Sequence, residues 1–359
     1  MQTDTFAKIL IRSPNWIGDQ VLAYPFFHML RKSQSQAHIV VACLPWVEAL
    51  QYRDLVDEVH VLDKPASIGF FHRFDSVESG ARRLRKMGPW DLGIAMPRSF
   101  STAWLLFRSS VKHRRGYKGD GRGLLLNDAL EWQPHSKSHR ATAFAALVPG
   151  HEPGSNPPEP VITDRFDFER SWFGLTFLEP PDFPYWVLAP GSVAESRRWP
   201  VDRFIELAKI IYAETGWKGL VVGGAAEASL ASLMLGEALH KNELLDWTAR
   251  GRVSSYASVF RNAKFTVSND SGLAHVASLC GSPVQIVWGA GDPRMTAPIG
   301  PGKVKITCNP IECWPCEQNT CPIASQTVSN DGKNACLKGI KASMVWNDIK
   351  TGILTPDYG

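Results

Sequence analysis

The sequence predicts an α/β fold made of two doubly wound, Rossmann-like domains that face each other across a cleft. Three observations support this prediction. The chain has 359 residues, which is enough for two domains with separate cores. Short apolar runs alternate with amphipathic helical patterns in both halves, as in a parallel sheet with helices on both faces. A stretch rich in proline and glycine separates the two halves.

The first half contains four short apolar runs that predict strands, at 8–12, 38–44, 58–62 and 91–95. Helical patterns follow at 20–32, 76–86 and 102–108. Around the middle helix, Val77, Leu84 and Met87 are spaced for a single buried face. The order of these patterns indicates a parallel sheet.

Breaker residues mark the connection between the halves. The segment 149–160 reads PGHEPGSNPPEP, and EPPDFP follows at 179–184, with a short helix expected between them. We therefore predict four parts: an N-terminal domain over 1–164, a linker over 165–184, a C-terminal domain over 185–340, and a tail over 341–359 that packs back on the N-terminal domain.

The second half repeats the pattern, with strands expected at 185–189, 218–222, 265–268 and 283–288. Helices are expected at 202–215, 227–240, 253–262 and 272–280. Neither half carries G-x-G-x-x-G or G-x-x-x-x-G-K-[ST] at a strand end, which counts against a dinucleotide dehydrogenase or a P-loop NTPase. Ligands of open α/β sheets bind at the carboxyl ends of the strands, so the loops there are the candidates for chemistry.

Composition excludes some function classes. The apolar fraction of 44% and charged fraction of 21% are ordinary for a globular protein. No apolar run approaches the roughly 20 residues of a membrane-spanning helix, and the first residues do not resemble a signal peptide, so we expect a cytoplasmic location. A net charge of +4 is too mild to indicate nucleic-acid binding, but it permits attraction to an anionic membrane surface or substrate.

The loop at 13–19 carries a carboxylate at the start of a helix. Asp19 is either a helix N-cap or a general base that accepts a proton from an attacking hydroxyl. The loop at 268–275 reads SNDSGLAH, and the exposed N–H groups of a helix start make it a ready site for a diphosphate. The alternative there is a capped helix with His275 facing the core.

Two further loops suit phosphate or nucleotide binding. In the segment 191–200, Arg197 and Arg198 follow a glycine turn, and guanidinium groups match phosphate oxygens, although a plain surface turn has the same composition. The Gly223-Gly224 pair lets a nucleotide approach the backbone, but a lone Gly-Gly is weak evidence.

Four late cysteines are spaced C-x4-C-x2-C-x4-C over 308–321. A C-x2-C pair can bind zinc, but no second such pair is present, so we expect reduced or structural thiols and no metal site. The chain has no D-x-D sequence, the common carboxylate pair for a divalent metal on a nucleotide diphosphate.

Taken together, these segments resemble the bacterial lipopolysaccharide heptosyltransferases, the family 9 glycosyltransferases of GT-B fold, and most closely the heptosyltransferase II group. The similarity spans nearly the whole chain. It rests on ILIRSPNWIGDQVLA, DLGIAMPRSFSTAWLLF with HRRGYKGDGRGLLLND, RRWPVDRFIELA, VSNDSGLAHVASLCGSPVQIVWGAGDPRMTAP, and ECWPCEQNTCP with ACLKGI.

The resemblance implies a GT-B fold and an inverting transfer of heptose from ADP-heptose to the lipopolysaccharide inner core, without metal or cofactor. Asp19 then corresponds to the catalytic base, and Arg197 stands where the family usually has a phosphate-binding lysine. The expected donor-binding residues of the C-terminal domain are Ser192, Arg197, Gly223, Glu227, Asp270, Ser271, Gly272 and His275. The expected acceptor-binding residues of the N-terminal domain are Asn15, Lys112, Arg114, Arg115 and Lys118.

The implied partners are a nucleotide-sugar donor, a lipid-linked core oligosaccharide and, peripherally, the inner leaflet of the inner membrane; no nucleic acid is implied. Two alternatives belong to other classes. A nucleotide-sugar epimerase shares the two-domain architecture but needs no acceptor. A non-enzymatic peripheral membrane or zinc-binding protein would not bind ADP tightly.

Overall fold

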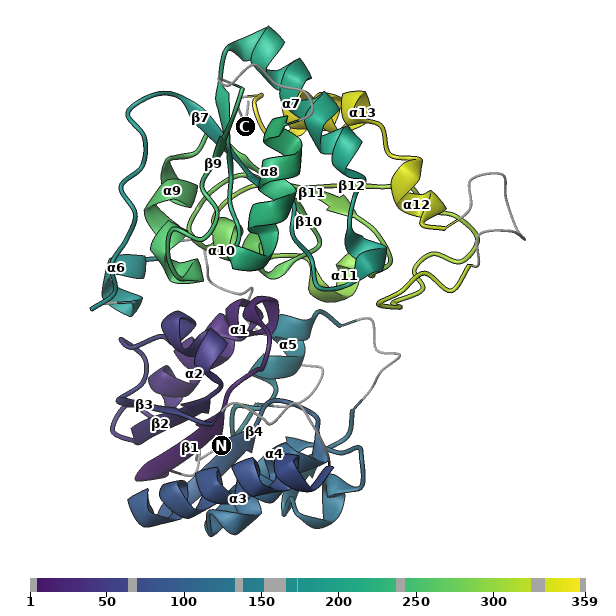
Figure 1. Ribbon diagram of the computed structural model, residues 1–359. Helices are drawn as coiled ribbons and strands as arrows, with labels where there is room; N and C mark the ends of the chain where they lie inside the picture. Colours follow the sequence, from purple (N-terminus) through teal and green to yellow (C-terminus); the bar gives the residue numbers. More distant parts are fainter. Residues whose placement is uncertain are drawn as a thin grey trace. The chain divides into compact units, whose positions relative to one another are not determined.

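The computed structural model describes residues 5–63, 70–132, 138–151, 166–172, 174–236, 243–323 and 333–355, with side chains of the first long helix described from residue 75 onward. The chain divides into two compact units (Figure 1). Unit 1 comprises 1–161 and 168–173, and unit 2 comprises 162–167 and 174–359.

Unit 1 is built on a six-stranded parallel sheet of order β3-β2-β1-β4-β5-β6. The strands are β1 (Lys8–Arg12), β2 (His38–Cys43), β3 (Glu58–Val61), β4 (Trp90–Ala95), β5 (Val111–Tyr117) and β6 (Asp128–Leu130). The central strands are buried almost throughout, because helices cover both faces of a parallel sheet. Ile9 of β1 is in register with Ile39 on one side and Leu92 on the other.

The helices of unit 1 are α1 (Ile17–Leu22), α2 (Tyr24–Ser33), η1 (Pro45–Leu50), α3 (Phe70–Met87), α4 (Phe100–Arg108), η2 (Arg122–Leu124), α5 (Arg140–Ala145) and α6 (Phe168–Ser171). The single helix expected over 20–32 is two helices that meet at Ala23. Pro25 has no N–H to continue the helical bonding of α1, which explains the break.

Unit 2 repeats the architecture with a parallel sheet of order β12-β11-β10-β7-β8-β9. Its strands are β7 (Tyr185–Ala189), β8 (Lys218–Val221), β9 (Leu244–Asp246), β10 (Thr266–Asn269), β11 (Val284–Trp288) and β12 (Val304–Cys308). Its helices are η3 (Glu195–Arg197), α7 (Val201–Thr215), η4 (Ala225–Glu227), α8 (Ala228–Gly236), η5 (Val253–Tyr256), α9 (Ala257–Asn262), α10 (Gly272–Leu279), α11 (Pro293–Thr296), α12 (Ala335–Lys338) and α13 (Ala342–Gly352). The predicted pair of doubly wound α/β domains is confirmed.

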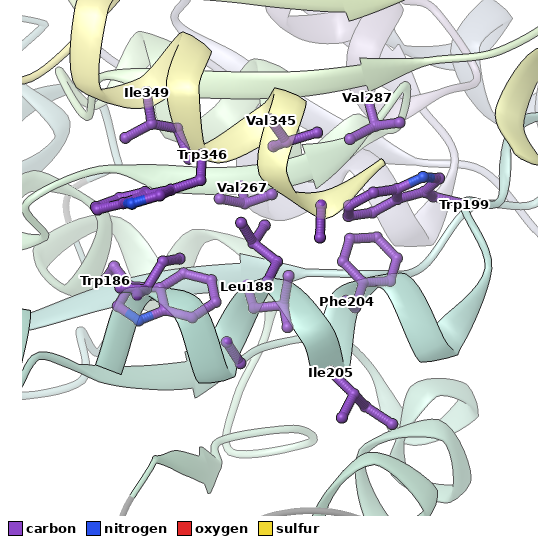
Figure 2. Close-up of a cluster of buried hydrophobic side chains, with 14 of the residues drawn as sticks. Trp186, Leu188, Trp199, Phe204, Ile205, Val267, Val287, Val345, Trp346 and Ile349 are labelled. Carbon is purple, nitrogen blue, oxygen red and sulfur yellow. The ribbon is translucent and has the colours of Figure 1, made fainter. Parts of the chain in front are cut away.

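The C-terminal helix α13 completes the core of unit 2. Its buried residues Val345, Trp346 and Ile349 pack with Trp186 of β7 and Phe204 of α7 (Figure 2). The helix within the predicted tail over 341–359 therefore belongs to the hydrophobic core of unit 2. The physical reason is that its apolar face covers the side of the sheet that α7 also covers.

The chain passes between the units in a way that a single linker over 165–184 does not capture. Phe166 accepts a hydrogen bond from Arg261 of unit 2. The short helix α6 belongs instead to unit 1, where Ser171 donates to Asp54 at 2.7 Å and accepts from the Arg53 N–H at 2.9 Å. None of the helices in the part of the chain described above is long and apolar enough to cross a bilayer.

Candidate active site

Each unit offers one functional edge, where the carboxyl ends of its strands meet. The strand order reverses direction between β1 and β4 in unit 1 and between β7 and β10 in unit 2. In doubly wound sheets ligands bind at such switch points. The loops after β1, β7 and β10 contain Asn15, Ser192, Asp270 and Ser271, and the helical segments that follow these loops contain Asp19, Arg197, Gly272 and His275.

Asp19 lies on the first turn of α1, at the switch point of unit 1. The N-cap of α1 is Trp16, so the alternative role of Asp19 as N-cap is wrong. Its carboxylate is 22% exposed and forms an ion pair of 3.1 Å with Arg140, at the start of the neighbouring helix α5. The pair holds a partly accessible carboxylate at the edge of the sheet, as a general base requires.

Asn15 lies in the same loop and is firmly positioned. Its side-chain oxygen accepts from Arg12 Nη2 at 2.6 Å, and its backbone oxygen accepts from the indole N–H of Trp46 at 2.6 Å. Arg12 is the last residue of β1 and is 6% exposed.

The expected basic cluster of 112–118 falls on β5, and the structure does not bring its members together. Lys112 pairs with Asp91 at 2.8 Å near the amino ends of β5 and β4, at the opposite edge of the sheet from Asp19. Arg114 donates to the backbone oxygens of 125 and 111. Arg115 is buried and pairs with Asp128 at 2.6 Å. Only Lys118, which follows β5 and pairs with Glu131, shares the carboxyl edge with Asp19 and Asn15.

In unit 2 the loop after β10 centres on Asp270. This residue is 4% exposed, and its carboxylate lies 3.2 Å from Nη1 of Arg197. Burial raises the pKa of Asp270 above its ordinary value, and the charge of Arg197 opposes that rise. A Cβ at Gly291 would come within 2.8 Å of the Asp270 carboxylate, so the loop after β11 approaches it closely. The expected phosphate clamp Arg197 is thus anchored by the expected donor residue Asp270.

The start of α10 faces the same edge. Ser271 is its N-cap, but no side-chain bond caps the helix, and the Ser271 hydroxyl instead lies 3.2 Å from that of Ser268. The first backbone N–H groups of α10, from Gly272 onward, carry positive potential from the helix dipole. His275, the fourth residue of α10, is buried, with 5% of its surface exposed.

The remaining candidates for donor binding, Ser192, Gly223 and Glu227, lie in or next to the loops after β7 and β8. Ser192 donates to the backbone oxygen of Asp270 at 3.4 Å. Glu227 accepts from the Gly224 N–H at 2.8 Å. A Cβ at Gly191 or Gly223 would come within 2.8 or 2.7 Å of the Glu227 side chain. The glycines therefore let Glu227 lie directly against the loops after β7 and β8.

All seven cysteines carry free thiols. The residues that the structure describes contain no group of three or more His, Cys, Asp or Glu side chains arranged to hold a metal ion. Burial raises the pKa of Cys336, and the neighbouring thiols Cys313, Cys316 and Cys321 add to the rise.

The profile of "Glycosyltransferase family 9 (heptosyltransferase)" matches residues 78–326. The chain belongs to glycosyltransferase family 9. It is 28% identical to lipooligosaccharide heptosyltransferase 2 of Haemophilus ducreyi, over 81% of this chain and 86% of that protein. It is 26% identical to lipopolysaccharide heptosyltransferase 2 of Escherichia coli, over 81% of this chain and 85% of that one.

Solved structures show the same fold. The structure of E. coli ADP-heptose lipopolysaccharide heptosyltransferase II superposes with a TM-score of 0.73 at 20% identity, covering 97% of this family 9 chain and 98% of that one. A family 9 glycosyltransferase from Veillonella parvula gives a TM-score of 0.74 at 19% identity, with coverage of 98% and 99%. Membership of family 9 makes the protein a glycosyltransferase and sets aside the epimerase and non-enzymatic alternatives.

Sequence reasoning missed two arginines at the carboxyl edge of the unit 1 sheet. Arg140 had no local signal, because its partner Asp19 lies 121 positions away. Arg12 did have one: a charged residue ends an otherwise apolar buried strand, KILIR.

Proposed function

We propose that the protein transfers heptose from ADP-heptose to the inner core of lipopolysaccharide, with inversion, while the lipid-linked acceptor lies at the inner face of the inner membrane. The names of the two heptosyltransferase 2 relatives support the donor sugar and the acceptor class. The anchored Arg197–Asp270 pair is the observation that carries the donor half of the proposal.

Unit 2 holds the donor in this proposal. Arg197 and the N–H groups at the start of α10 bind the diphosphate and offset the negative charge that grows on the departing ADP. Glu227, packed against two glycine loops, is placed to accept hydrogen bonds from the nucleoside.

Unit 1 supplies the base. The acceptor oxygen forms a bond to the anomeric carbon as the bond from that carbon to the ADP oxygen breaks, and the hydroxyl proton passes to the Asp19 carboxylate. Arg140 fixes that carboxylate from the side of α5. One displacement of this kind inverts the anomeric centre.

No divalent metal is part of the proposal, because Arg197 and the α10 N-terminus supply positive charge toward the diphosphate. Unchanged transfer after dialysis against EDTA is the expected result. Loss of activity that Mg²⁺ restores would contradict this part.

The deciding experiment combines donors and acceptors with the purified protein and reads the products by mass. The donors are ADP-heptose and ADP-glucose, and the acceptors are core glycolipids truncated before or after the first heptose. We expect heptose to be added to the glycolipid that ends in the first heptose. Conversion of the donor sugar without any acceptor, or addition of glucose alone, would overturn the proposal.

A further inference from the structure

Two tryptophans lie exposed at the carboxyl edge of the unit 1 sheet, beside Asp19. Trp16 is 60% exposed and is the N-cap of α1, and Trp46 is 42% exposed in η1, which follows β2. Asp19 stands three positions after Trp16, on the first turn of α1. An indole is a large apolar group, so its exposure to water is unfavourable until a ligand or partner covers it.

A hydrogen bond fixes the two tryptophans next to each other. The indole N–H of Trp46 donates to the backbone oxygen of Asn15 at 2.6 Å, and this oxygen belongs to the peptide group that joins Asn15 to Trp16. The backbone oxygen of Trp16 accepts from the Gln20 N–H at 2.9 Å, which ties Trp16 to the first turn of α1. Both indoles are therefore attached to the loop that leads into the helix of Asp19, and the polar atom of the Trp46 ring is already bound.

Other exposed apolar side chains of unit 1 lie at the same edge of the sheet. Val61 ends β3, and Leu124 lies in η2, which follows β5. Phe107, 45% exposed near the end of α4, lies toward the opposite edge, because α4 leads back to the start of β5. Single exposed apolar side chains are ordinary, whereas several at one functional edge indicate a binding surface.

The polar groups near the tryptophans indicate which kind of ligand fits there. The Asp19 carboxylate and its partner Arg140 are both partly exposed. An acyl chain at this place would remove them from water without replacing their hydrogen bonds, which is costly. A pyranose ring carries C–H groups on its faces and hydroxyl groups around its edge. Its C–H face can lie on the electron-rich face of an indole while a hydroxyl meets the carboxylate, so the surroundings favour a sugar over a lipid.

A cavity of about 110 Å³ adjoins the tryptophans. Asn15 and Leu44, each within two positions of one of the tryptophans, line it together with Ser99, Ser101 and Thr102 from the start of α4. The volume leaves room for a few waters, or for the hydroxyl substituents of a sugar whose ring lies outside. The hydroxyl and amide groups of the lining residues suit such substituents.

We propose that Trp16 and Trp46 form an aromatic platform for the acceptor, and that the sugar ring with the attacking hydroxyl stacks on it. Stacking fixes the plane of this ring and turns its hydroxyl toward Asp19, on the helix that Trp16 caps. The platform thereby selects an acceptor whose last residue is a pyranose with an open C–H face. This inference rests on the proposed function, because it assigns the stacked sugar to the acceptor.

The first test is a KM measurement on Trp16→Ala and Trp46→Ala, with Phe107→Ala as the matched control. Phe107→Ala removes an aromatic ring of similar exposure away from the platform. The acceptor is the deacylated core oligosaccharide that ends in the first heptose, so no lipid takes part. We expect both tryptophan variants to raise the acceptor KM about tenfold or more and to leave the ADP-heptose KM within about twofold. An unchanged acceptor KM in Trp16→Ala would overturn the proposal.

Two further variants separate stacking from apolar contact in general. Trp16→Phe keeps an aromatic face and is expected to hold the acceptor KM within about threefold of the wild type. Trp16→Leu keeps an apolar side chain without that face and is expected to bind the acceptor as weakly as Trp16→Ala. Equal acceptor KM values in Trp16→Phe and Trp16→Leu would overturn the proposal. Should Trp46→Ala not fold, the Trp16 series decides the outcome.

The acylated acceptor and the value of kcat test two other occupants of the platform. A rise in KM for the acylated acceptor alone would mean that the indoles meet lipid. A fall in kcat with both KM values unchanged would mean that the indoles meet unit 2 during the reaction. Either result would overturn the proposal.

A binding experiment keeps the platform separate from the proposed function. With ADP present and no sugar donor, calorimetry is expected to show that the deacylated oligosaccharide binds Trp16→Ala at least about tenfold more weakly than the wild type. If the wild type transfers no heptose but this difference is found, the proposed function fails and the platform stands. If transfer occurs but both proteins bind the oligosaccharide equally, the platform fails. A wild type that neither transfers heptose nor binds the oligosaccharide would contradict both.

Discussion

At the scale of single residues, the carboxyl edge of each sheet pairs a carboxylate that follows a strand with an arginine from a distant part of the chain. Asp19 pairs with Arg140 in unit 1, and Asp270 pairs with Arg197 in unit 2. The carboxylates could be predicted from sequence because each follows a strand, whereas the pairings could not, because they depend on how loops meet in three dimensions. The Asp19 side chain is 22% exposed and that of Asp270 is 4% exposed. We therefore assign proton transfer to Asp19 and the anchoring of Arg197 to Asp270.

Asp19→Asn is expected to lower kcat about 100-fold or more, because a positioned general base contributes on the order of 10²–10⁴ in rate. Binding of ADP to unit 2 should be unchanged. Steady-state kinetics and calorimetry measure the two quantities, and Glu58→Gln, an exposed carboxylate of unit 1, is the control. Near-normal turnover in Asp19→Asn would remove it as the base.

Asp270→Asn tests the buried carboxylate through its pH dependence. Because burial raises the folded-state pKa of Asp270, folding favours its protonated form. That contribution to stability is complete below the ordinary pKa and is lost as the pH rises through the folded pKa. Asparagine does not ionise, so the thermal midpoint of Asp270→Asn should rise relative to that of the wild type as the pH increases from the ordinary Asp pKa, about 4, through the raised folded-state pKa of Asp270. A difference in thermal midpoint between the two proteins that stays constant with pH would contradict the raised pKa of Asp270. Asp270→Asn is also expected to bind ADP more weakly than the wild type at both ends of this pH range.

At the scale of elements, apolar periodicity located the strands that are buried on both faces. The predicted strand at 8–12 coincides with β1, and that at 185–189 with β7. The strand β5 was missed because its sequence, VKHRRGY, looks like a solvated basic turn. Its charged side chains are compatible with a strand because Arg114 donates hydrogen bonds to backbone oxygens and Arg115 forms an ion pair with Asp128. The expectation that Lys112, Arg114 and Arg115 bind the acceptor rests on the same interpretation of this segment.

The apolar face of α13 is the element-scale feature with the clearest energetic consequence. Trp346 is 3% exposed within the cluster of Figure 2, so Trp346→Ala should lower the free energy of unfolding of unit 2 by about 3–5 kcal/mol. Met344 lies on the same helix at 43% exposure, and Met344→Ala should change it by no more than about 0.5 kcal/mol. Urea denaturation of both variants measures the difference. Equal effects would mean that the helix is not part of the core.

At the scale of the whole molecule, the chain uses one architecture twice. Each unit has a parallel six-stranded sheet, its own buried core and one edge with a switch point. The shared pattern was predictable, because strand–helix alternation restarts after the proline-rich stretch. The return of the chain to unit 1 at α6, before it enters unit 2 again, was not predictable. It depends on tertiary hydrogen bonds such as that of Ser171 to Asp54.

Two separate cores and the nucleotide site that we propose for unit 2 predict an asymmetric response to ADP. A ligand that binds only the folded state stabilises it by about 2.7 kcal/mol at a concentration 100 times its Kd. ADP should therefore shift the unfolding of unit 2 to higher temperature, and hydrogen exchange should slow in β7 and α10 while β1 and β4 keep their rates. In Arg197→Ala the shift should shrink. In Arg203→Ala, which removes a partly exposed arginine of α7 paired with Glu206, the shift should be kept. Slowed exchange in β1 instead of β7 would place the nucleotide on unit 1 and reverse the assignment of the two units.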